Sequence, residues 1–290
     1  IRASANLVLA DGVYARVSGV YKHQDGYVDQ LDYGCVFPSN TLGVGTSAGS
    51  GKDCVISKLG EKDYAGVRGS LRINPSDVFD LVISADYTRE ERSNAAEVPT
   101  TVNSAKTSAT YLCGKFCTYA NFYAPAGGQA TQGYTMPNTT KFEGWGASAN
   151  LTVNLSDSLN IQSITAYRSY NQIWGTDDDF SPDTVIIGQG YNDLDFWFFS
   201  QELRLNGKIG DNIDFTLGGF YSDQQSLYYT RQDIRYIVPG VPALYLQFMG
   251  NDPVNADSRA LFGTVIARPI EGMTITGGLL GLTNTSNTSA

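Results

Sequence analysis

The chain has 290 residues and a formal net charge of -9, with 20 Lys and Arg against 29 Asp and Glu. This acidic balance argues against a nucleic-acid partner, because phosphate binding needs a basic surface. One His and four Cys leave few ligands for a metal site and little for His-based catalysis, so we expect no enzyme activity, no metal and no cofactor. Tyr (18), Phe (13) and Gly (31) are plentiful while charged residues make up only 17%, a mix typical of a β-rich protein.

The first residues of the chain already predict a β-strand. The stretch IRASANLVLADG, residues 1–12, has no basic region, apolar core or cleavage site of a signal peptide. We therefore expect the chain to begin inside a fold and to be a fragment of a longer product. No apolar run approaches the roughly 18 residues that a transmembrane helix needs.

Alternation of apolar and polar side chains recurs along the chain. It is clearest in residues 65–74, 79–88, 145–155, 196–207 and 213–223. In 196–207, the apolar side chains Trp197, Phe199, Leu203 and Leu205 fall on one face, with Gln201 as the exception, and Glu202 and Arg204 fall on the other. A period of two indicates β-strands. The pattern predicts about ten strands of roughly ten residues or more, the length of a tilted membrane-spanning strand.

The connections between these strands alternate in length. Short turns occur at 10–12, 75–77, 156–158, 210–212 and 271–272, and long polar stretches at 23–61, 92–140, 177–195 and 232–257. This rhythm is typical of an antiparallel outer-membrane β-barrel, with short periplasmic turns and long extracellular loops. Soluble sandwiches rarely tolerate several structureless loops of this length.

Aromatic residues near strand ends provide a second indication of a membrane barrel. Trp197 and Phe199 begin one strand on the loop side, and Tyr87 and Tyr221 fall near the loop-side ends of two others. These four predict the upper aromatic girdle on the lipid-facing side, and Phe79 and Phe215 the lower one. Trp197, Phe199, Leu203 and Leu205 are then expected to face lipid, and Glu202 and Arg204 a wet lumen.

Three segments resemble the barrel of TonB-dependent outer-membrane receptors. They are GSLRINPSDVFDLVISADYTREE (residues 69–91), LNIQSITAYRSY (159–170) and SQELRLNGKIGDNIDFTLGGFYSDQQ (200–225). In that family a descending strand, a Pro-Ser-Asp or Gly-Asp turn and an ascending strand recur in this form. The resemblance implies energy-coupled uptake of a scarce, bulky solute such as a ferric siderophore, a vitamin or an oligosaccharide.

The same resemblance implies partners and a larger whole. The resemblance implies a barrel of roughly 22 strands. The family's plug domain and coupling box have no counterpart in these residues. We expect residues 1–282 to be part of the barrel and 283–290 to be a polar tail of uncertain origin. Implied partners are outer-membrane lipid and lipopolysaccharide, a small-molecule or oligosaccharide ligand, and an inner-membrane energy-transducing protein acting through the missing plug.

The four cysteines lie in the first two long loops. Cys35 and Cys54 share the first loop, and Cys113 and Cys117 share the second. A local disulfide in each loop is favoured over metal binding, because cell-surface loops are oxidising and a four-Cys zinc site needs two-residue spacings in a compact module.

Other candidate site residues each have a structural alternative. Lumen-facing Arg68, Arg72, Glu202 and Arg204 could select a charged solute, or could be ordinary interior pairs. The aromatic loop candidates for ligand contact are Tyr119, Phe122, Tyr123 and Trp174, and packing of the second loop onto itself explains the first three equally well. The acidic candidates are Asp177, Asp178 and Asp179, for which a solvated acidic loop is favoured over a site for Ca²⁺ or a cationic ligand.

Two other function classes stay open from the sequence. A passive porin-like channel would have a constriction made by an inward-folded loop and no plug. A soluble or surface-anchored β-rich adhesin would bury the aromatic face of residues 196–207 against protein.

Overall fold

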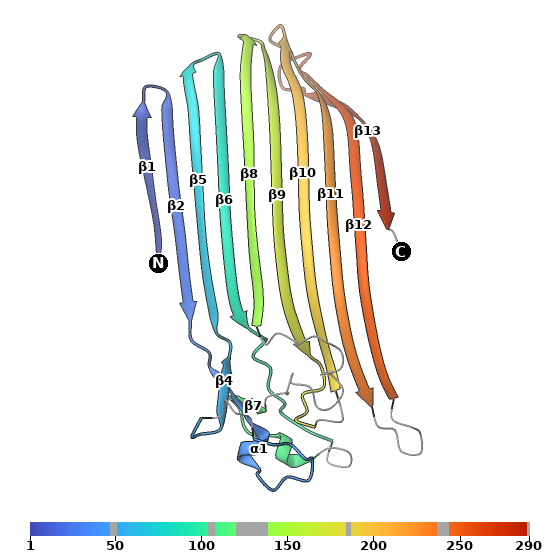
Figure 1. Ribbon diagram of the computed structural model, residues 1–290. Helices are drawn as coiled ribbons and strands as arrows, with labels where there is room; N and C mark the ends of the chain where they lie inside the picture. Colours follow the sequence, from blue (N-terminus) through green and yellow to red (C-terminus); the bar gives the residue numbers. More distant parts are fainter. Residues whose placement is uncertain (47–50, 104–107, 120–138, 184–186, 237–243, 289–290) are drawn as a thin grey trace.

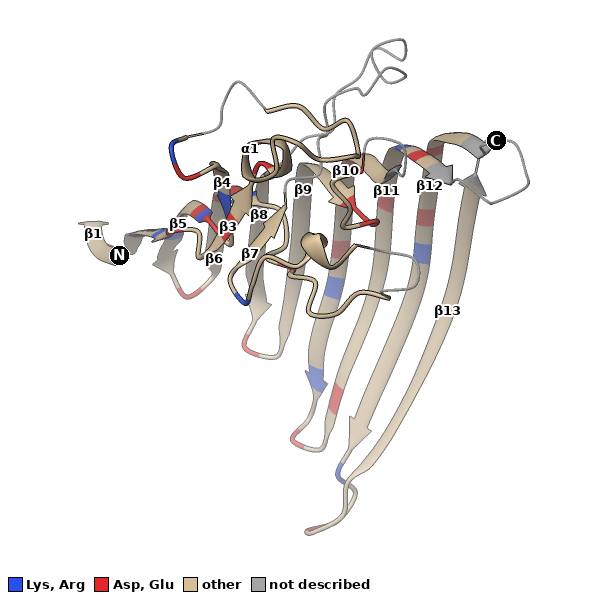
Figure 2. Ribbon diagram, turned by 90° about the horizontal axis from the view of Figure 1, so that it is seen from below, with Lys and Arg blue, Asp and Glu red and all other residues tan. Residues whose placement is uncertain are grey.

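The computed structural model describes residues 1–46, 51–103, 108–119, 139–183, 187–236 and 244–288. Its main feature is a ten-stranded antiparallel sheet in the order β1-β2-β5-β6-β8-β9-β10-β11-β12-β13, a single curved layer (Figures 1 and 2). The strands are β1 (Arg2–Ala10), β2 (Val13–Gln24), β5 (Lys62–Ser76), β6 (Phe79–Ser93), β8 (Thr139–Ser156), β9 (Leu159–Asp177), β10 (Ile187–Ile209), β11 (Ile213–Tyr236), β12 (Leu244–Ala267) and β13 (Ile275–Thr288). The predicted all-β fold with about ten antiparallel strands is confirmed.

Short turns join these strands at one end of the sheet, and the long loops emerge at the other (Figure 1). Three of the turns use a glycine in the left-handed region, with φ of 70° at Gly12, 59° at Gly210 and 77° at Gly272. At Gly12 a Cβ atom would also lie 2.4 Å from the Asn74 carbonyl oxygen. Glycine is therefore required there for both conformation and space.

The strand register sorts the side chains onto two faces. We call the face that carries Trp197 the outer face and the face that carries Arg204 the inner face. Residues directly opposite one another share a face, so Trp197 on β10 aligns with Ser169 on β9, which aligns with Trp145 on β8 and Tyr87 on β6. The outer face is apolar along the turn-side half of the strands and the inner face is polar, which is the alternation of a membrane barrel.

Two long loops predicted from the sequence are largely strand. β10, β11 and β12 run for 23, 24 and 24 residues, and β11 pairs with β12 continuously from Ile213↔Ala267 to Tyr236↔Leu244. The predicted loops at 177–195 and 232–257 were therefore too long. Beyond the membrane both faces of a strand are wet, so polar residues occupy both faces and the alternation that marks a strand disappears.

The first two long loops form a small subdomain at the loop end. β3 (Val28–Leu31), β4 (Val55–Leu59) and β7 (Cys117–Tyr119) make a second sheet in the order β4-β3-β7. β3 pairs antiparallel with β4 of its own loop and parallel with β7 of the next loop, so backbone hydrogen bonds tie the two loops together. A one-turn helix, α1 (Tyr33–Val36), and a 3₁₀ turn (Ala109–Tyr111) complete the subdomain (Figure 1). These loops are thus folded rather than structureless.

The polar segment near the end of the chain continues a strand. β13 extends to Thr288 and pairs with β12 from Ala267↔Ile275 to Val254↔Thr288. β13 has no charged side chain and is tan throughout in Figure 2. In the part of the chain that the structure describes, no helix is long and apolar enough to cross a membrane.

Candidate functional site

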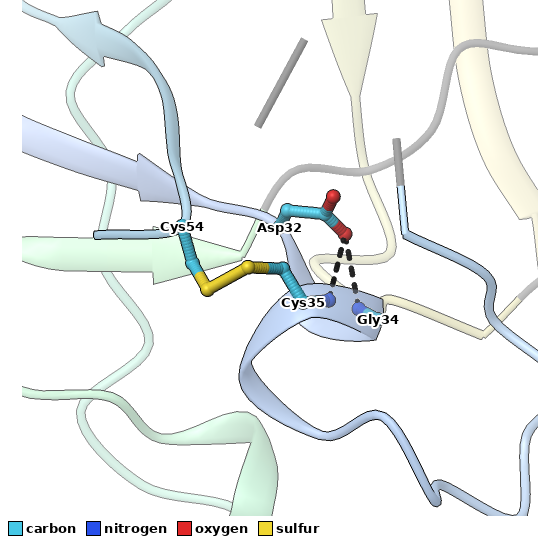
Figure 3. The surroundings of a disulfide bond; sticks show 4 residues. All are labelled: Asp32, Gly34, Cys35 and Cys54. Carbon is cyan, nitrogen blue, oxygen red and sulfur yellow. Dashed lines mark hydrogen bonds between the residues drawn. A yellow bond between two sulfur atoms is a disulfide. The ribbon is translucent and has the colours of Figure 1, made fainter. Parts of the chain in front are cut away.

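The loop subdomain is held together by two disulfides and an aromatic core. Cys35 is bonded to Cys54, and Cys113 to Cys117. The Cys35–Cys54 bond joins α1 to the start of β4 (Figure 3). Beside it, buried Asp32 caps α1, with its carboxylate accepting hydrogen bonds from the backbone N–H groups of Gly34 at 3.0 Å and Cys35 at 3.3 Å. Capping satisfies donors that a helix start would otherwise leave unpaired.

The core of this subdomain contains one predicted ligand-contact residue. Tyr119 is 9% exposed, and its ring packs edge-on against Tyr33 with centroids 5.0 Å apart. Burial raises the pKa of the Tyr119 phenol. The structure therefore places Tyr119 mainly in the packing of the subdomain. Phe122 and Tyr123, predicted alongside it, lie outside the described residues.

The predicted residues of the third loop have local partners. Trp174 stacks on Tyr228 of β11 with ring centroids 6.0 Å apart. Asp177 accepts from the Phe180 N–H at 3.3 Å, and Asp179 accepts from the N–H groups of Ser181 and Gly188. The Thr176 hydroxyl donates to Asp178 at 3.4 Å. These carboxylates shape a turn, and among the described residues no group of three or more His, Cys, Asp or Glu could hold a metal ion.

A large cavity lies between the three loops. It has a volume of about 780 Å³ and is lined by residues of all three, including Leu42, Val98, Tyr111 and Phe180. Phe180 has a φ of 51°, a conformation that a bulky residue rarely adopts. The bond from its N–H to Asp177 helps to hold it there. The cavity is a candidate for first contact with a ligand because it opens at the loop end and has an aromatic lining.

The four predicted lumen-facing residues lie on the inner face but differ in their partners. Arg72 makes a bidentate pair with Asp80, at 2.9 and 2.8 Å, and Arg204 pairs with Glu202 two residues away on β10. Charged pairs of this kind satisfy one another within a barrel wall. Arg68 has no ion-pair or side-chain hydrogen-bond partner among the described residues.

Arg68 lines a cavity of about 530 Å³ on the inner face, at the β1 side of the sheet. Two more guanidinium groups line it, those of Arg2 on β1 and Arg168 on β9, together with the Asp86 carboxylate on β6. Arg168 donates to both Asp86 oxygens, at 3.0 and 3.1 Å. Arg2, Arg168 and Asp86 were missed from the sequence, because alternation gives their face but not which distant strands become neighbours.

Aromatic side chains form a band on the outer face at the loop-side limit of the apolar zone. The ring centroids of Trp145 and Tyr167 are 5.1 Å apart, those of Tyr167 and Trp197 6.5 Å, and those of Phe199 and Tyr221 6.3 Å. Each of these contacts is offset by two residues from the direct register, as expected for strands tilted to a barrel axis. The predicted girdle residues Tyr87, Trp197, Phe199 and Tyr221 all lie in this band.

No protein-family model and no curated protein matches this sequence closely. Solved structures do match its fold. The ferric yersiniabactin uptake receptor FyuA from Yersinia pestis superposes with a TM-score of 0.63 at 11% identity, over 99% of this chain and 40% of that one. The ferric-catecholate import receptor Fiu from E. coli K12 gives 0.57 at 10%, over 99% and 43%. The ferripyoverdine receptor of the outer membrane of Pseudomonas aeruginosa gives 0.57 at 10%, over 99% and 35%.

These likenesses establish the fold. Nearly the whole chain takes part in them, but it spans well under half the length of each of these receptors. Together with the apolar outer face and its aromatic band, the fold is that of an outer-membrane β-barrel segment, as the sequence predicted.

Proposed function

We propose that this chain is part of an outer-membrane receptor for energy-coupled uptake of a scarce, bulky solute, in the manner of TonB-dependent receptors. The observation that carries the proposal is the fold match over 99% of the chain to FyuA, a ferric yersiniabactin uptake receptor, and Fiu, a ferric-catecholate import receptor. The barrel itself performs no chemistry in this proposal. Its loops capture the solute and its lumen guides it inward.

Open sheet edges support the idea that these strands belong to a larger barrel. β1 and β13 each pair on one side only in the ten-stranded sheet. Unpaired backbone groups in hydrocarbon cost several kcal/mol each, so a sheet with such edges must be closed by further strands. Closure also creates the lumen that a plug would fill and an inner-membrane energy-transducing partner would act upon.

The loop subdomain and the loop-end cavity suit solute capture. Backbone pairing between β3 and β7 joins the first two loops, and one disulfide within each loop restrains it further, which lowers the entropy lost on binding. The cavity of about 780 Å³ falls in the usual size range of small-molecule sites.

The exposed outer face does not favour the adhesin alternative. Trp145 is 49% exposed and Leu203 54%, so the apolar face is not packed against protein in this chain. A porin-like channel would pass solute without an energy source, whereas uptake by the proposed receptor requires one. The energy dependence of uptake therefore distinguishes the two.

The test is uptake by cells that carry the intact protein, compared with a deletion strain. Radioactive iron supplied as hydroxamate, catecholate and mixed-ligand siderophores should accumulate for one class, and a protonophore should abolish the accumulation. Energy-independent diffusion of small sugars through reconstituted protein would instead support a porin. Absence of the protein from the outer-membrane fraction would overturn both.

A further inference from the structure

The inner-face cavity at the β1 side of the sheet carries more positive charge than its own residues neutralise. Three guanidinium groups line it, from Arg2, Arg68 and Arg168, against the single carboxylate of Asp86. Arg168 is bonded to Asp86, while Arg2 and Arg68 have no charged partner among the described residues. This excess occurs in a chain whose net charge is -9, so it does not reflect overall composition.

The strand register explains how these groups come together. One row of paired residues crosses the inner face from Ser4 to Ser18, Arg68, Asp86, Gly146 and Arg168. Directly opposite residues have Cβ atoms roughly 4.5–5.5 Å apart. Asp86 therefore lies between two guanidinium groups and cannot neutralise both.

Two glycines shape the cavity. Gly146 separates Arg168 from Asp86, and a Cβ atom there would lie 2.9 Å from an Arg168 Nη atom, so its absence lets Arg168 cross β8. Gly66 lies across β2 from Arg2, and together with Val20 and Thr88 it forms part of the lining. Small residues leave room at the wall. The hydroxyl groups of Ser4 and Tyr64 around it are donors for a ligand, while the Ser18 hydroxyl donates to the Arg68 carbonyl oxygen at 3.5 Å.

We propose that this cavity binds an anionic, oxygen-rich solute, one that carries carboxylate, sulfonate or phosphate groups, through Arg2 and Arg68. Guanidinium groups bind such oxygens bidentately and keep their charge at all physiological pH values. The cavity lies on the inner wall at the level of the aromatic band, because Arg68 and Asp86 are sequence neighbours of Val67 and Tyr87. A role of this cavity in solute uptake rests on the proposed function, whereas binding of an anion by the cavity does not.

The experiment measures equilibrium binding of pyrenetetrasulfonate, a fluorescent polyanion, to the intact protein extracted in detergent from its membrane. Fluorescence anisotropy should show saturable binding. Arg68→Gln and Arg2→Gln should each weaken it roughly tenfold, the usual effect of losing one charge-assisted hydrogen bond. Affinity should stay constant between about pH 6 and pH 9, because arginine does not titrate there.

Arg16→Gln is the matched control. Arg16 lies on the inner face of β2, two residues from Ser18, is unpaired among the described residues and does not line the cavity. It should leave binding within twofold. Asp86→Asn should strengthen binding several-fold, a gain that misfolding cannot produce.

Three results would overturn the proposal. One is equal weakening by Arg16→Gln and Arg68→Gln, which would mean diffuse attraction to the wall. Another is no saturable binding to the wild-type protein. The third is a loss of thermal stability in Arg68→Gln without any change in dye binding. That result would mean that the arginines bind an acidic segment of the protein itself rather than a solute. Dye binding needs no energised membrane, so failure of uptake alone would overturn the proposed function and leave this site intact.

Discussion

At the scale of single residues, His23 is held between two carboxylates at the loop-side end of β2, beyond the aromatic Tyr21. Its Nδ1 atom lies 2.7 Å from Asp63 and its Nε2 atom 3.1 Å from Asp25. The hydrogen bond with Asp63 is the main cause that raises the pKa of His23, followed by that with Asp25, and the same bond with His23 lowers the pKa of Asp63. Both ring nitrogens donate only when the ring is protonated.

The first prediction is therefore a pH dependence of this corner. A raised histidine pKa stabilises the folded state fully below the unfolded value of 6.5, and the effect is lost as the pH rises through the folded pKa. A lowered Asp63 pKa stabilises above the unfolded value of 3.8 and is lost as the pH falls through the folded pKa. The contact between His23 and Asp63 should therefore be strongest between pH 3.8 and pH 6.5, where both contributions are fully present.

Nuclear magnetic resonance titration of labelled histidine checks this prediction, with the His23 signal assigned by its loss in His23→Gln. The midpoint should lie above 6.5 and fall toward that value in Asp63→Asn. A wild-type midpoint at or below pH 6.5 would contradict it.

The second prediction concerns an aromatic ring that covers a glycine. Gly218 on β11 is directly opposite Phe262 on β12, and a Cβ atom on Gly218 would lie 2.2 Å from the Phe262 ring. Gly218→Ala should displace the ring and destabilise the barrel by about 1–3 kcal/mol, the usual cost of overpacking. Gly219→Ala is the control, because its nearest neighbour would be a Leu261 methyl carbon at an ordinary 3.5 Å. Urea unfolding in detergent should separate the two variants, and equal stabilities would refute the close contact.

At the scale of elements, the loop subdomain gains its order from cross-links between segments that have little core. Its buried hydrophobic cluster consists of Tyr33, Val44 and Tyr119, with partly buried neighbours around it. A core of this size contributes little burial energy compared with the entropy of ordering two long loops. The disulfides and the β3–β7 pairing therefore carry much of the stability.

The third prediction compares the two disulfides. Cys35–Cys54 spans a sequence separation of 19 and Cys113–Cys117 one of 4. The loop-entropy relation gives about 3 kcal/mol for the longer loop and about 2 kcal/mol for the shorter one. Replacing both cysteines of a pair by serine should thus raise hydrogen exchange in β3 and β4 more for the first pair, with exchange in β8–β12 unchanged. A larger effect from the second pair would contradict the entropic argument.

At the scale of the whole molecule, the two faces of the sheet are expected to meet different solvents. The outer face from Trp145 to Leu155 on β8 carries only apolar side chains, over a length that suffices to cross the hydrocarbon layer. The inner face carries the ion pairs Arg72–Asp80 and Arg168–Asp86. Charge on the outer face should thus be costly and charge on the inner face tolerated.

The fourth prediction tests this assignment with two substitutions on one strand. Leu151→Arg lies mid-strand on the outer face and should cost about 2–4 kcal/mol, the depth-dependent penalty for arginine facing lipid. Ser148→Arg, three residues away on the exposed inner face, should cost little. Folding into lipid vesicles, followed by heat-dependent gel mobility, measures both. If Ser148→Arg were the more damaging variant, the assignment of faces would be reversed.

The sequence by itself determined the strands, their faces and the class of fold. Alternation in residues such as 196–207 depends only on local geometry, since neighbouring side chains of a strand point to opposite sides. The turn residues and the aromatic ends of strands are equally local, and together they indicated a membrane barrel. Both faces are wet in β11 after Leu227 and in the part of β12 that pairs with it. There this local signal failed, and the strands were predicted too short.

Only the tertiary structure decided which charged residues have partners. Arg68 and Arg72 lie on the same face of β5, and the sequence treated them alike. The strand register places Asp80 within hydrogen-bonding distance of Arg72. The Arg168 side chain instead crosses β8 and pairs with Asp86, so Arg68 has no carboxylate partner among the described residues. Residues 86 and 168 are far apart in the chain, and the pairing of their strands through β8 is a property of the assembled sheet. For the same reason, the parallel pairing of β3 with β7 and the cavity shared by three loops had no signal in the sequence.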